Sequence, residues 1–307
     1  MITLHEVTKR YGRLVAVDGV TLTVRPGECC VVLGSNGAGK TTIFRMVSTL
    51  TAPTAGRLEV AGHDVATAGP EIRRRIGYLP EVPPIYPEMT VATYLRFVAG
   101  CRGFGLGAGA DQAQRALERC GLGDVRHRLA GNLSKGYRQR IGLAQALVGD
   151  PDVLILDEPT LGLDPPQAAD IRGLVLELAA ERTVLLSTHI LSEAAALGRR
   201  IVILHRGRVL ADAPPERLGT GGRDLTLALR RPGGGVAETI AAIPGVLEVA
   251  PRGEGRYLIT TLAEADCREA IASLAVEKDW GLLELASATD SLEETFLRLV
   301  VDAEHRR

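Results

Sequence analysis

The sequence predicts an α/β fold followed by a smaller α+β domain, and three observations support this prediction. Three short apolar runs, at residues 29–33, 153–156 and 183–188, have the continuous hydrophobicity of strands buried inside a parallel sheet. Segments with apolar residues at helical spacing alternate with these runs, as they do in βαβ units. A stretch rich in proline and glycine, residues 214–222, then separates a first domain from the rest of the 307 residues.

The composition is that of a packed globular protein without a strong electrostatic field. Hydrophobic residues make up 46% and charged residues 24% of the chain, and 36 basic and 37 acidic side chains give a net charge of −1. This balance does not favour nucleic acid or anionic lipid as a general partner. The five cysteines contain no CxxC pair, which suits a reducing cytosol. No apolar run approaches the roughly 18 residues that cross a bilayer, so another chain would have to supply a membrane span.

Residues 2–33 are predicted to form short strands with turn residues between them. The segments 3–7 and 20–24 alternate apolar and polar residues, which is the pattern of strands with one buried face. A Pro26-Gly27 turn then leads into the buried run 29–33. These strands are therefore expected to precede and lead into the buried sheet of the first domain.

A glycine-rich stretch follows the buried run 29–33 and fits the pattern G-x-x-x-x-G-K-S/T; its residues are Gly34, Ser35, Asn36, Gly37, Ala38, Gly39, Lys40, Thr41 and Thr42. Glycines let the backbone turn sharply and bring N–H groups against phosphate oxygens, and the helix expected after them adds the positive end of its dipole. Lys40 is expected to reach the β- and γ-phosphates, and the Thr41 hydroxyl to ligate Mg²⁺. A chance match is the alternative, and the strand before and the helix after make it less favourable. The stretch thus predicts a nucleotide site.

Tyr11 is a candidate for stacking on the adenine base of that nucleotide. It lies in the loop 9–12, and aromatic residues make up only 4% of the chain. The simpler alternative is an ordinary half-buried aromatic residue.

Residues 82–150 are predicted to form a helical subdomain. Val91, Tyr94, Leu95 and Val98 give one apolar face at helical spacing, and the five glycines within 100–109 are expected to form a flexible connector. Ser134 is a suitable N-cap for the helix that follows it. Because the N–H groups at a helix start and a small residue such as Gly136 allow an oxyanion to approach closely, Ser134 and Gly136 also predict a second anion site.

Acidic residues end the buried run 153–156, at the edge of the sheet where open α/β folds bind ligands. Adjacent acids at such a place are costly unless a cation or a water network uses them. Asp157 is expected to hold Mg²⁺ through water, and Glu158 to take a proton from an attacking water. His189 follows the run 183–188 at the same edge, and we expect it to contact the γ-phosphate or that water, although a single histidine is more often structural.

The C-terminal part, residues 216–307, is predicted to be an accessory domain separate from residues 1–215. Strand patterns at 225–229, 246–249, 257–261 and 282–286 alternate with helical patterns at 235–243 and 264–275, and a last helix covers 291–301. The order β-α-β-β-α-β predicts a ferredoxin-like fold. Trp280 and Cys267 are expected in its core.

Taken in order, the motifs of residues 2–212 resemble the ATP-binding subunit of an ABC transporter. The resemblance rests on Tyr11, 34–42, Glu81, 133–139, 153–158, Leu163-Asp164 and His189. Its discriminating element is Ser134-x-Gly136 before a helix, which other phosphate-loop NTPases lack. The resemblance implies an ABC-type P-loop ATPase domain, which has a mixed sheet at its core, an antiparallel β part and a helical subdomain.

This resemblance also implies a site shared between two subunits. The phosphate loop of one copy and the Ser134–Gly136 helix start of the other enclose each ATP, with Asp164 at the same interface. Lys40, Glu158 and His189 are the implied catalytic residues, and Thr41, Asp157 and Glu81 the implied Mg²⁺ ligands. A homodimer is the simplest assembly.

Glu81 stands where the family usually has glutamine. A carboxylate can still ligate Mg²⁺ and sense the γ-phosphate, though it adds a negative charge. Its context, residues 76–81 followed by 88–91, resembles the exporter subfamily whose membrane partners are ABC-2 type permeases. The resemblance therefore implies a peripheral subunit at the cytoplasmic face of the membrane, with the permease contacting the helical region near Glu81.

Two other functions fit parts of the sequence. The first is a soluble ABC-type ATPase that acts on ribosomes or DNA, but the chain has one cassette rather than two, no coiled-coil insertion and a near-neutral charge. The second is a nucleotide-binding scaffold without catalysis, which the presence of Lys40, Asp157, Glu158 and His189 disfavours. We therefore expect an ATP-hydrolysing exporter subunit with no nucleic acid partner.

Overall fold

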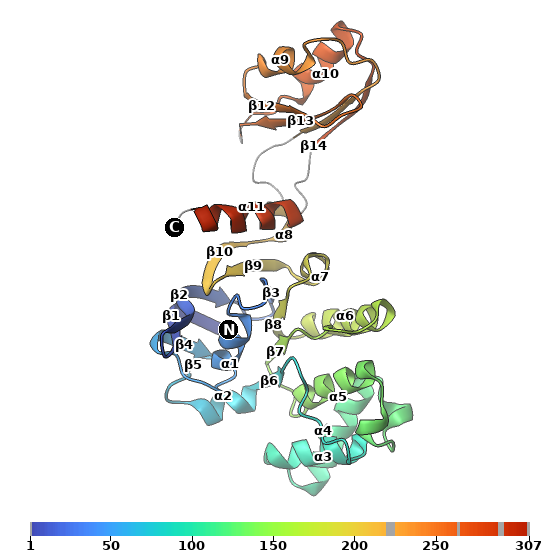
Figure 1. Cartoon of the computed structure of the whole chain (residues 1–307). Helices are drawn as coiled ribbons and strands as arrows, with labels where there is room; N and C mark the ends of the chain where they lie inside the picture. The colour runs from blue at the N-terminus through green and yellow to red at the C-terminus, as the bar shows by residue number, and fades with distance from the viewer. Residues whose placement is uncertain (1, 219–224, 263–264, 288–291, 306–307) are drawn as a thin grey trace. The chain divides into compact units, whose positions relative to one another are not determined.

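The structure is a computed structural model that describes residues 2–218, 225–262, 265–287 and 292–305 (Figure 1). It divides into two compact units, Met1–Pro215 and Glu216–Arg307. The boundary falls at Pro214-Pro215, and the glycine-rich part of the expected linker, 219–222, lies outside the described residues. No helix in the described part of the chain is both long and apolar enough to span a bilayer.

An antiparallel sheet in the first unit has the strand order β2-β1-β4-β5. Its strands are β1 (Ile2–Tyr11), β2 (Leu14–Val24), β4 (Ala55–Val60) and β5 (His63–Asp64). Strands β1 and β2 are longer than the alternating segments 3–7 and 20–24 predicted from sequence. The register of β1 against β2 shifts between Leu4 and Arg10, which indicates bulges along the pair. The antiparallel part of the expected fold is confirmed.

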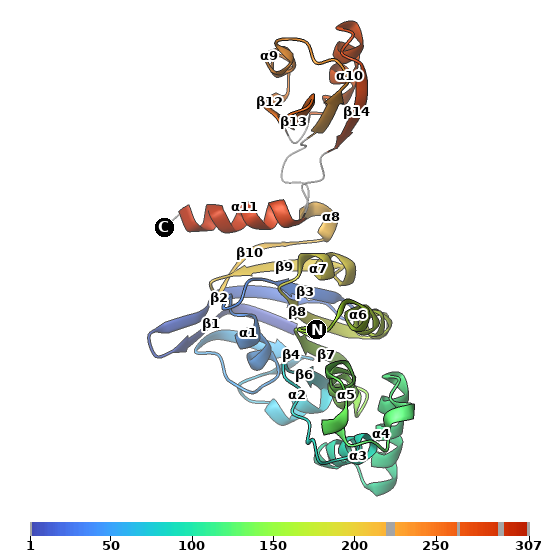
Figure 2. The same cartoon turned by 45° about the vertical axis from the view of Figure 1, so that its right-hand side comes forward.

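The second sheet of this unit has the order β10-β9-β3-β8-β7-β6, which Figure 2 shows from β10 at the top to β6. Its strands are β3 (Cys29–Leu33), β6 (Ile76–Leu79), β7 (Val153–Asp157), β8 (Thr183–Thr188), β9 (Arg200–His205) and β10 (Arg208–Ala213). All neighbours pair in parallel except β10 with β9. The carboxyl ends of the parallel strands therefore meet at one edge.

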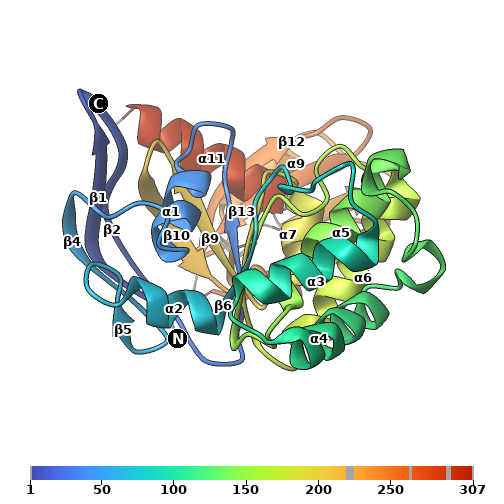
Figure 3. The same cartoon turned by 90° about the horizontal axis from the view of Figure 1, so that it is seen from below.

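Helix α1 (Lys40–Val47) lies between the two sheets, and Figure 3 shows it on the side opposite α5 (Lys135–Leu147) and α6 (Pro165–Ala179). Phe44 and Ile43 of α1 are buried in a core cluster to which both sheets contribute. Helices α6 and α7 (Leu191–Leu197) contact β8, and α7 also contacts β3. Because every residue of β3, β7 and β8 is buried, their continuous apolar runs have hydrophobic contacts on both faces.

The cysteines of β3 are core residues, as their position in an apolar strand indicates. Cys29 and Cys30 are buried and free. Burial raises the pKa of Cys29 to about 11 and raises the pKa of Cys30 further. These thiols therefore stay protonated near neutral pH and act as small hydrophobic groups.

The helical subdomain contains α3 (Val91–Cys101), α4 (Leu106–Arg119) and α5, which gather in green below α6 in Figure 1. Val91, Tyr94 and Leu95 are buried, so the predicted apolar face of α3 is confirmed, although Val98 is only partly buried. The expected connector at 100–109 is wrong in part, because α4 already begins at Leu106. A short helix, α2 (Gly69–Arg75), precedes β6 and carries the arginine run of the sequence.

The second unit has the topology of a ferredoxin-like fold. Its sheet order is β12-β13-β11-β14, with every neighbour antiparallel, and the strands are β11 (Leu225–Leu229), β12 (Val246–Pro251), β13 (Arg256–Thr261) and β14 (Leu282–Ser287). Helix α9 (Val236–Ala241) links β11 to β12, and α10 (Arg268–Glu277) links β13 to β14. Trp280 and Cys267 lie in its core, as predicted. The short α8 (Pro215–Leu218) and α11 (Leu292–His305) complete the elements.

Candidate active site

The phosphate loop connects the carboxyl end of β3 to the start of α1. At two of its glycines the surrounding backbone leaves no room for a side chain. A Cβ atom on Gly34 would lie 2.4 Å from the carbonyl oxygen of Leu204. Gly39 has a φ of +106°, and a Cβ on it would lie 2.6 Å from the carbonyl oxygen of Ala16. Helix α1 begins at Lys40 with no side-chain cap and no acidic residue in its first turn, so its N–H groups suit an anion.

Lys40, Glu158 and His189, which sequence analysis named as catalytic residues, lie together at this sheet edge. Lys40 Nζ is 3.1 Å from Glu158 Oε1, and their side chains are only 6% and 7% exposed. Glu158 Oε2 is 2.9 Å from Nδ1 of His189, whose side chain is 35% exposed. Lys40 Nζ also donates to the carbonyl oxygen of Gly34 at 2.7 Å. One carboxylate thus holds the phosphate-loop lysine and an imidazole at the same time.

Glu158 adopts a strained backbone conformation. Its φ is +50°, in the left-handed region that non-glycine residues rarely occupy. The backbone N–H of Glu158 donates to Ser187 Oγ at 2.9 Å, and this bond helps to hold the turn in place. Strain of this kind is retained where the surrounding structure fixes a side chain for a function.

Asp157 has the environment expected of a ligand to a hard cation. Its Oδ1 accepts from Ser187 Oγ at 2.6 Å, while its buried Oδ2 has no hydrogen-bond partner among the residues that the structure describes. Burial raises the pKa of the Asp157 carboxyl, the nearby hydroxyls of Ser187 and Thr41 oppose this rise, and the negative charges of Glu158 and Glu81 add to it. The hydroxyl of Thr41 and the charge of Glu81 therefore both act on Asp157.

These oxygen donors fit Mg²⁺, which binds through one or two carboxylates and completes its shell with water and phosphate oxygens. Thr41, Asp157 and Glu81 are the residues that would hold it. A cage made of three or more histidine, cysteine or acidic side chains is not found within the described ranges, and Mg²⁺ does not require one.

Ser187 was not singled out from the sequence, although it connects the two acids. Its hydroxyl donates to Asp157 and accepts from the N–H of Glu158. The residue is fully buried at the end of β8, two positions before His189. A polar residue at the end of an otherwise apolar run was the available signal, but the contact itself depends on the pairing of β7 with β8.

Ser134, Gly136 and Asp164 form a second group, at the starts of α5 and α6. Ser134 caps α5 by accepting from the N–H of Tyr137, and Asp164 caps α6 by accepting from the N–H of Gln167 at 2.9 Å. A Cβ on Gly136 would lie 2.7 Å from Oε1 of Gln167. In the described structure, these contacts tie the second group to α6 and not to the phosphate loop.

Tyr11, the candidate for stacking on adenine, ends β1 and is 46% exposed. The Nζ atom of Lys9 lies 5.2 Å from the centre of its ring. Much of this aromatic surface is therefore available to a planar ligand.

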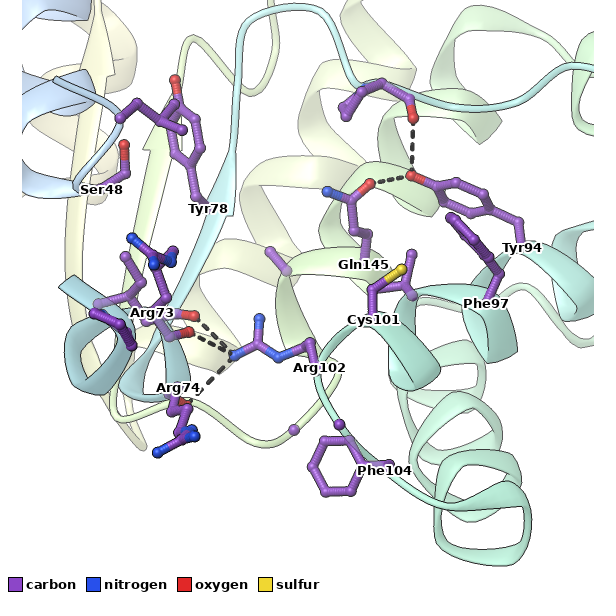
Figure 4. A pocket seen from close by; sticks show the side chains of 18 of the residues that line it. Ser48, Arg73, Arg74, Tyr78, Tyr94, Phe97, Cys101, Arg102, Phe104 and Gln145 are labelled. Carbon is purple, nitrogen blue, oxygen red and sulfur yellow. Dashed lines mark hydrogen bonds between the residues drawn. The ribbon is translucent and has the colours of Figure 1, made fainter.

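A groove of about 830 Å³ lies in the first unit between α2 and the helical subdomain (Figure 4). Aromatic rings line the helical side, where Tyr86 packs edge-on against Phe97 with ring centres 5.6 Å apart. Arg73 and Arg74 line the other side. Arg102 crosses the groove and donates to the carbonyl oxygens of Arg73 and Ile76, at 3.3 and 3.0 Å. The Tyr94 hydroxyl lies within hydrogen-bond distance of the Pro84 carbonyl oxygen, at 3.0 Å, and of the Gln145 side-chain amide.

A phosphate loop, a buried glutamate and a carboxylate suited to Mg²⁺ at the carboxyl edge of a parallel sheet define a phosphate-loop ATPase. The family model described as ABC transporter matches residues 17–161. This chain belongs to the ABC transporter family, as an ATP-hydrolysing, ATP-binding subunit. The resemblance drawn from the motifs is confirmed.

Two curated relatives and one solved structure illustrate the similarity. The chain is 36% identical to the daunorubicin resistance ATP-binding protein DrrA3 of Streptomyces coeruleorubidus, over 98% of this chain and 96% of the relative. It is 41% identical to the Nod factor export ATP-binding protein I of Burkholderia pseudomallei, over 71% and 72%. The dimeric structure of MJ0796, a bacterial ABC transporter cassette, is 26% identical, with a TM-score of 0.64 over 70% of this chain and 98% of that one.

Proposed function

We propose that two copies of this chain enclose ATP and Mg²⁺ and hydrolyse the ATP to drive an ABC-2 type membrane exporter. The observation that carries the proposal is the buried carboxylate of Glu158, which touches Lys40 of the phosphate loop and His189 at once. A base beside the γ-phosphate end of the loop is what water attack on ATP requires.

The Lys40–Glu158 contact suggests how substrate binding prepares the base. A triphosphate carries more negative charge than one carboxylate, so it competes with Glu158 for Lys40. When Lys40 turns to the phosphates, Oε1 of Glu158 is released and can accept the proton of an attacking water. His189 keeps its contact with Oε2 and orients the carboxylate. Mg²⁺ supplies neutralising charge on the phosphate oxygens when it is bound.

Ser134, Gly136 and Asp164 are proposed to complete the site from a second copy. The phosphate loop covers one side of a triphosphate and leaves its γ-phosphate open. The start of α5 offers N–H groups, and Gly136 leaves room for close approach. Tyr11 is proposed to stack on the adenine. The dimeric state of the MJ0796 cassette supports this arrangement.

The groove of Figure 4 is the proposed contact for the membrane partner, which would hold this subunit at the cytoplasmic face. A cytoplasmic segment of a permease with an apolar face and acidic residues would match Phe97 and Tyr86 on one side and Arg73 and Arg74 on the other. Glu81 lies in the same loop as Pro84 and Tyr86, which line the groove, so a partner docked there would contact the loop that carries a proposed Mg²⁺ ligand. The relatives' names mention two different compounds, daunorubicin and Nod factor, which supports a choice of cargo that is made by the membrane partner and not by this chain.

Co-expression with a membrane protein encoded next to this chain tests the proposal. The wild type should co-purify with that protein in detergent and release phosphate from ATP. Phe97→Asp should lose co-purification while the isolated chain keeps its ATPase rate. Leu106→Asp is the matched control, because Leu106 is 99% exposed on α4 and does not line the groove. Co-purification with ribosomes or DNA instead, or equal retention of both variants on the membrane protein, would contradict it.

A further inference from the structure

We propose that Glu193 is a positioning residue that fixes the loop after Glu158 and the loop of His189 relative to each other. The proposal rests on the catalytic roles proposed for Glu158 and His189. Glu193 lies in the first turn of α7 and is 4% exposed.

The carboxylate of Glu193 receives hydrogen bonds from three separate elements. Thr160 Oγ1 donates to Oε2 at 2.7 Å, and Thr188 Oγ1 donates to the same oxygen at 3.0 Å. Arg172 of α6 reaches Oε1 with its Nη1 at 3.4 Å. A buried carboxylate is costly unless such partners surround it, so this cluster is a specific arrangement and not a general packing contact.

The two threonines belong to the two catalytic loops. Thr160 lies two residues after Glu158, in a turn closed by the bond from the N–H of Leu161 to the carbonyl oxygen of Glu158, at 3.1 Å. Thr188 ends β8 directly before His189, and its hydroxyl accepts from the N–H of Ile190 at 3.0 Å. A single oxygen atom of Glu193 is therefore a common anchor for the segments that carry the base and the imidazole.

The phosphate loop has its own supports. Lys40 is held by the carbonyl oxygens of Gly34 and Ser35, and Gly39 is packed against the backbone of Ala16. Loss of Glu193 should therefore alter the distance between Glu158 and His189, while the affinity for the nucleotide should stay nearly unchanged. Misplacement of reacting groups by about 1 Å costs roughly 100-fold in rate.

Steady-state kinetics of Glu193→Ala tests the inference. We expect kcat to fall roughly 10- to 100-fold while KM for ATP changes less than about threefold. Glu193→Gln keeps one side-chain oxygen that can accept from the hydroxyls of Thr160 and Thr188, so it should retain most of the wild-type kcat. Thr160→Val, which removes one donor while keeping the shape, should lower kcat several-fold, whereas Thr160→Ser should match the wild type.

Ser192→Ala is the control on the same helix, because Ser192 is exposed. Wild-type kcat in a folded Glu193→Ala protein would overturn the inference, as would a rise in KM that parallels the loss of kcat. If Glu193→Ala does not fold, the Thr160 variants decide, and a kcat of Thr160→Val equal to that of Thr160→Ser would overturn the inference. Glu158→Gln assayed in parallel separates the two proposals, since its full activity would reject the catalytic role of Glu158 whatever Glu193 does.

Discussion

Replacing Glu158 with glutamine is expected to reduce ATP hydrolysis by roughly 100- to 10,000-fold, the usual contribution of a general base. Glutamine has nearly the same shape and keeps an oxygen for His189, but it does not take a proton from water. Because Lys40 loses a carboxylate partner, the phosphates meet less competition for it. The Glu158→Gln protein should therefore bind ATP well and accumulate as an ATP-bound dimer.

Two measurements check this prediction. Phosphate release gives the rate, and size exclusion with and without ATP gives the dimer. Glu177→Gln is the matched control, because Glu177 is an exposed residue of α6 outside the site. Hydrolysis near the wild-type rate, or a protein that remains monomeric with saturating ATP, would be incompatible with the proposed role of Glu158.

Lys40→Met is expected to weaken ATP binding by roughly 100- to 10,000-fold. Charge-assisted hydrogen bonds are worth about 1.5–3 kcal/mol each, and Lys40 is proposed to make them to two phosphates. Methionine keeps the apolar stem and removes only the charge. The substitution also leaves Glu158 buried without its cation, which costs about 3–5 kcal/mol of stability. The Lys40→Met/Glu158→Gln double variant removes that second effect.

Titration with a fluorescent ATP analogue measures the loss of affinity. The double variant should remain as stable to heat as Glu158→Gln alone while binding ATP as poorly as Lys40→Met. Lys278→Met, an exposed change in the second unit, should bind normally. Undiminished affinity in both Lys40 variants would exclude Lys40 from phosphate binding.

The parts of this molecule that depend on short sequence patterns were predictable. Apolar runs indicated β3, β7 and β8, and the rule that parallel strands share a carboxyl edge brought Asp157, Glu158 and His189 together. The order of strand and helix patterns after residue 224 was sufficient for a ferredoxin-like topology.

Other features depend on contacts between distant segments. The bond of Ser187 to Asp157 requires the register of β7 against β8, and the convergence of Thr160 and Thr188 on Glu193 requires α7 to pack beside both loops. The glycines of 100–109 suggested a connector, yet Gly109 lies inside α4, where its Cα faces Ala99 and Phe104. A small residue there allows close helix packing, which composition alone does not reveal.

The central claim is that each ATP is enclosed by Lys40 of one copy and Ser134 of another. Ser134→Asp suits a test, because aspartate caps a helix as well as serine does but repels a phosphate. Ser134→Asn is its neutral control. Both Ser134→Asp and Lys40→Met are prepared in the Glu158→Gln protein and labelled with different fluorophores.

Energy transfer between the two labelled proteins is the deciding measurement. Each variant alone should stay monomeric with ATP, and the mixture should form ATP-dependent mixed dimers, because one shared site then has both Lys40 and Ser134 intact. Self-association of the Ser134→Asp protein as strong as that of its Glu158→Gln parent, or an ATP-saturated mixture without energy transfer, would contradict the account.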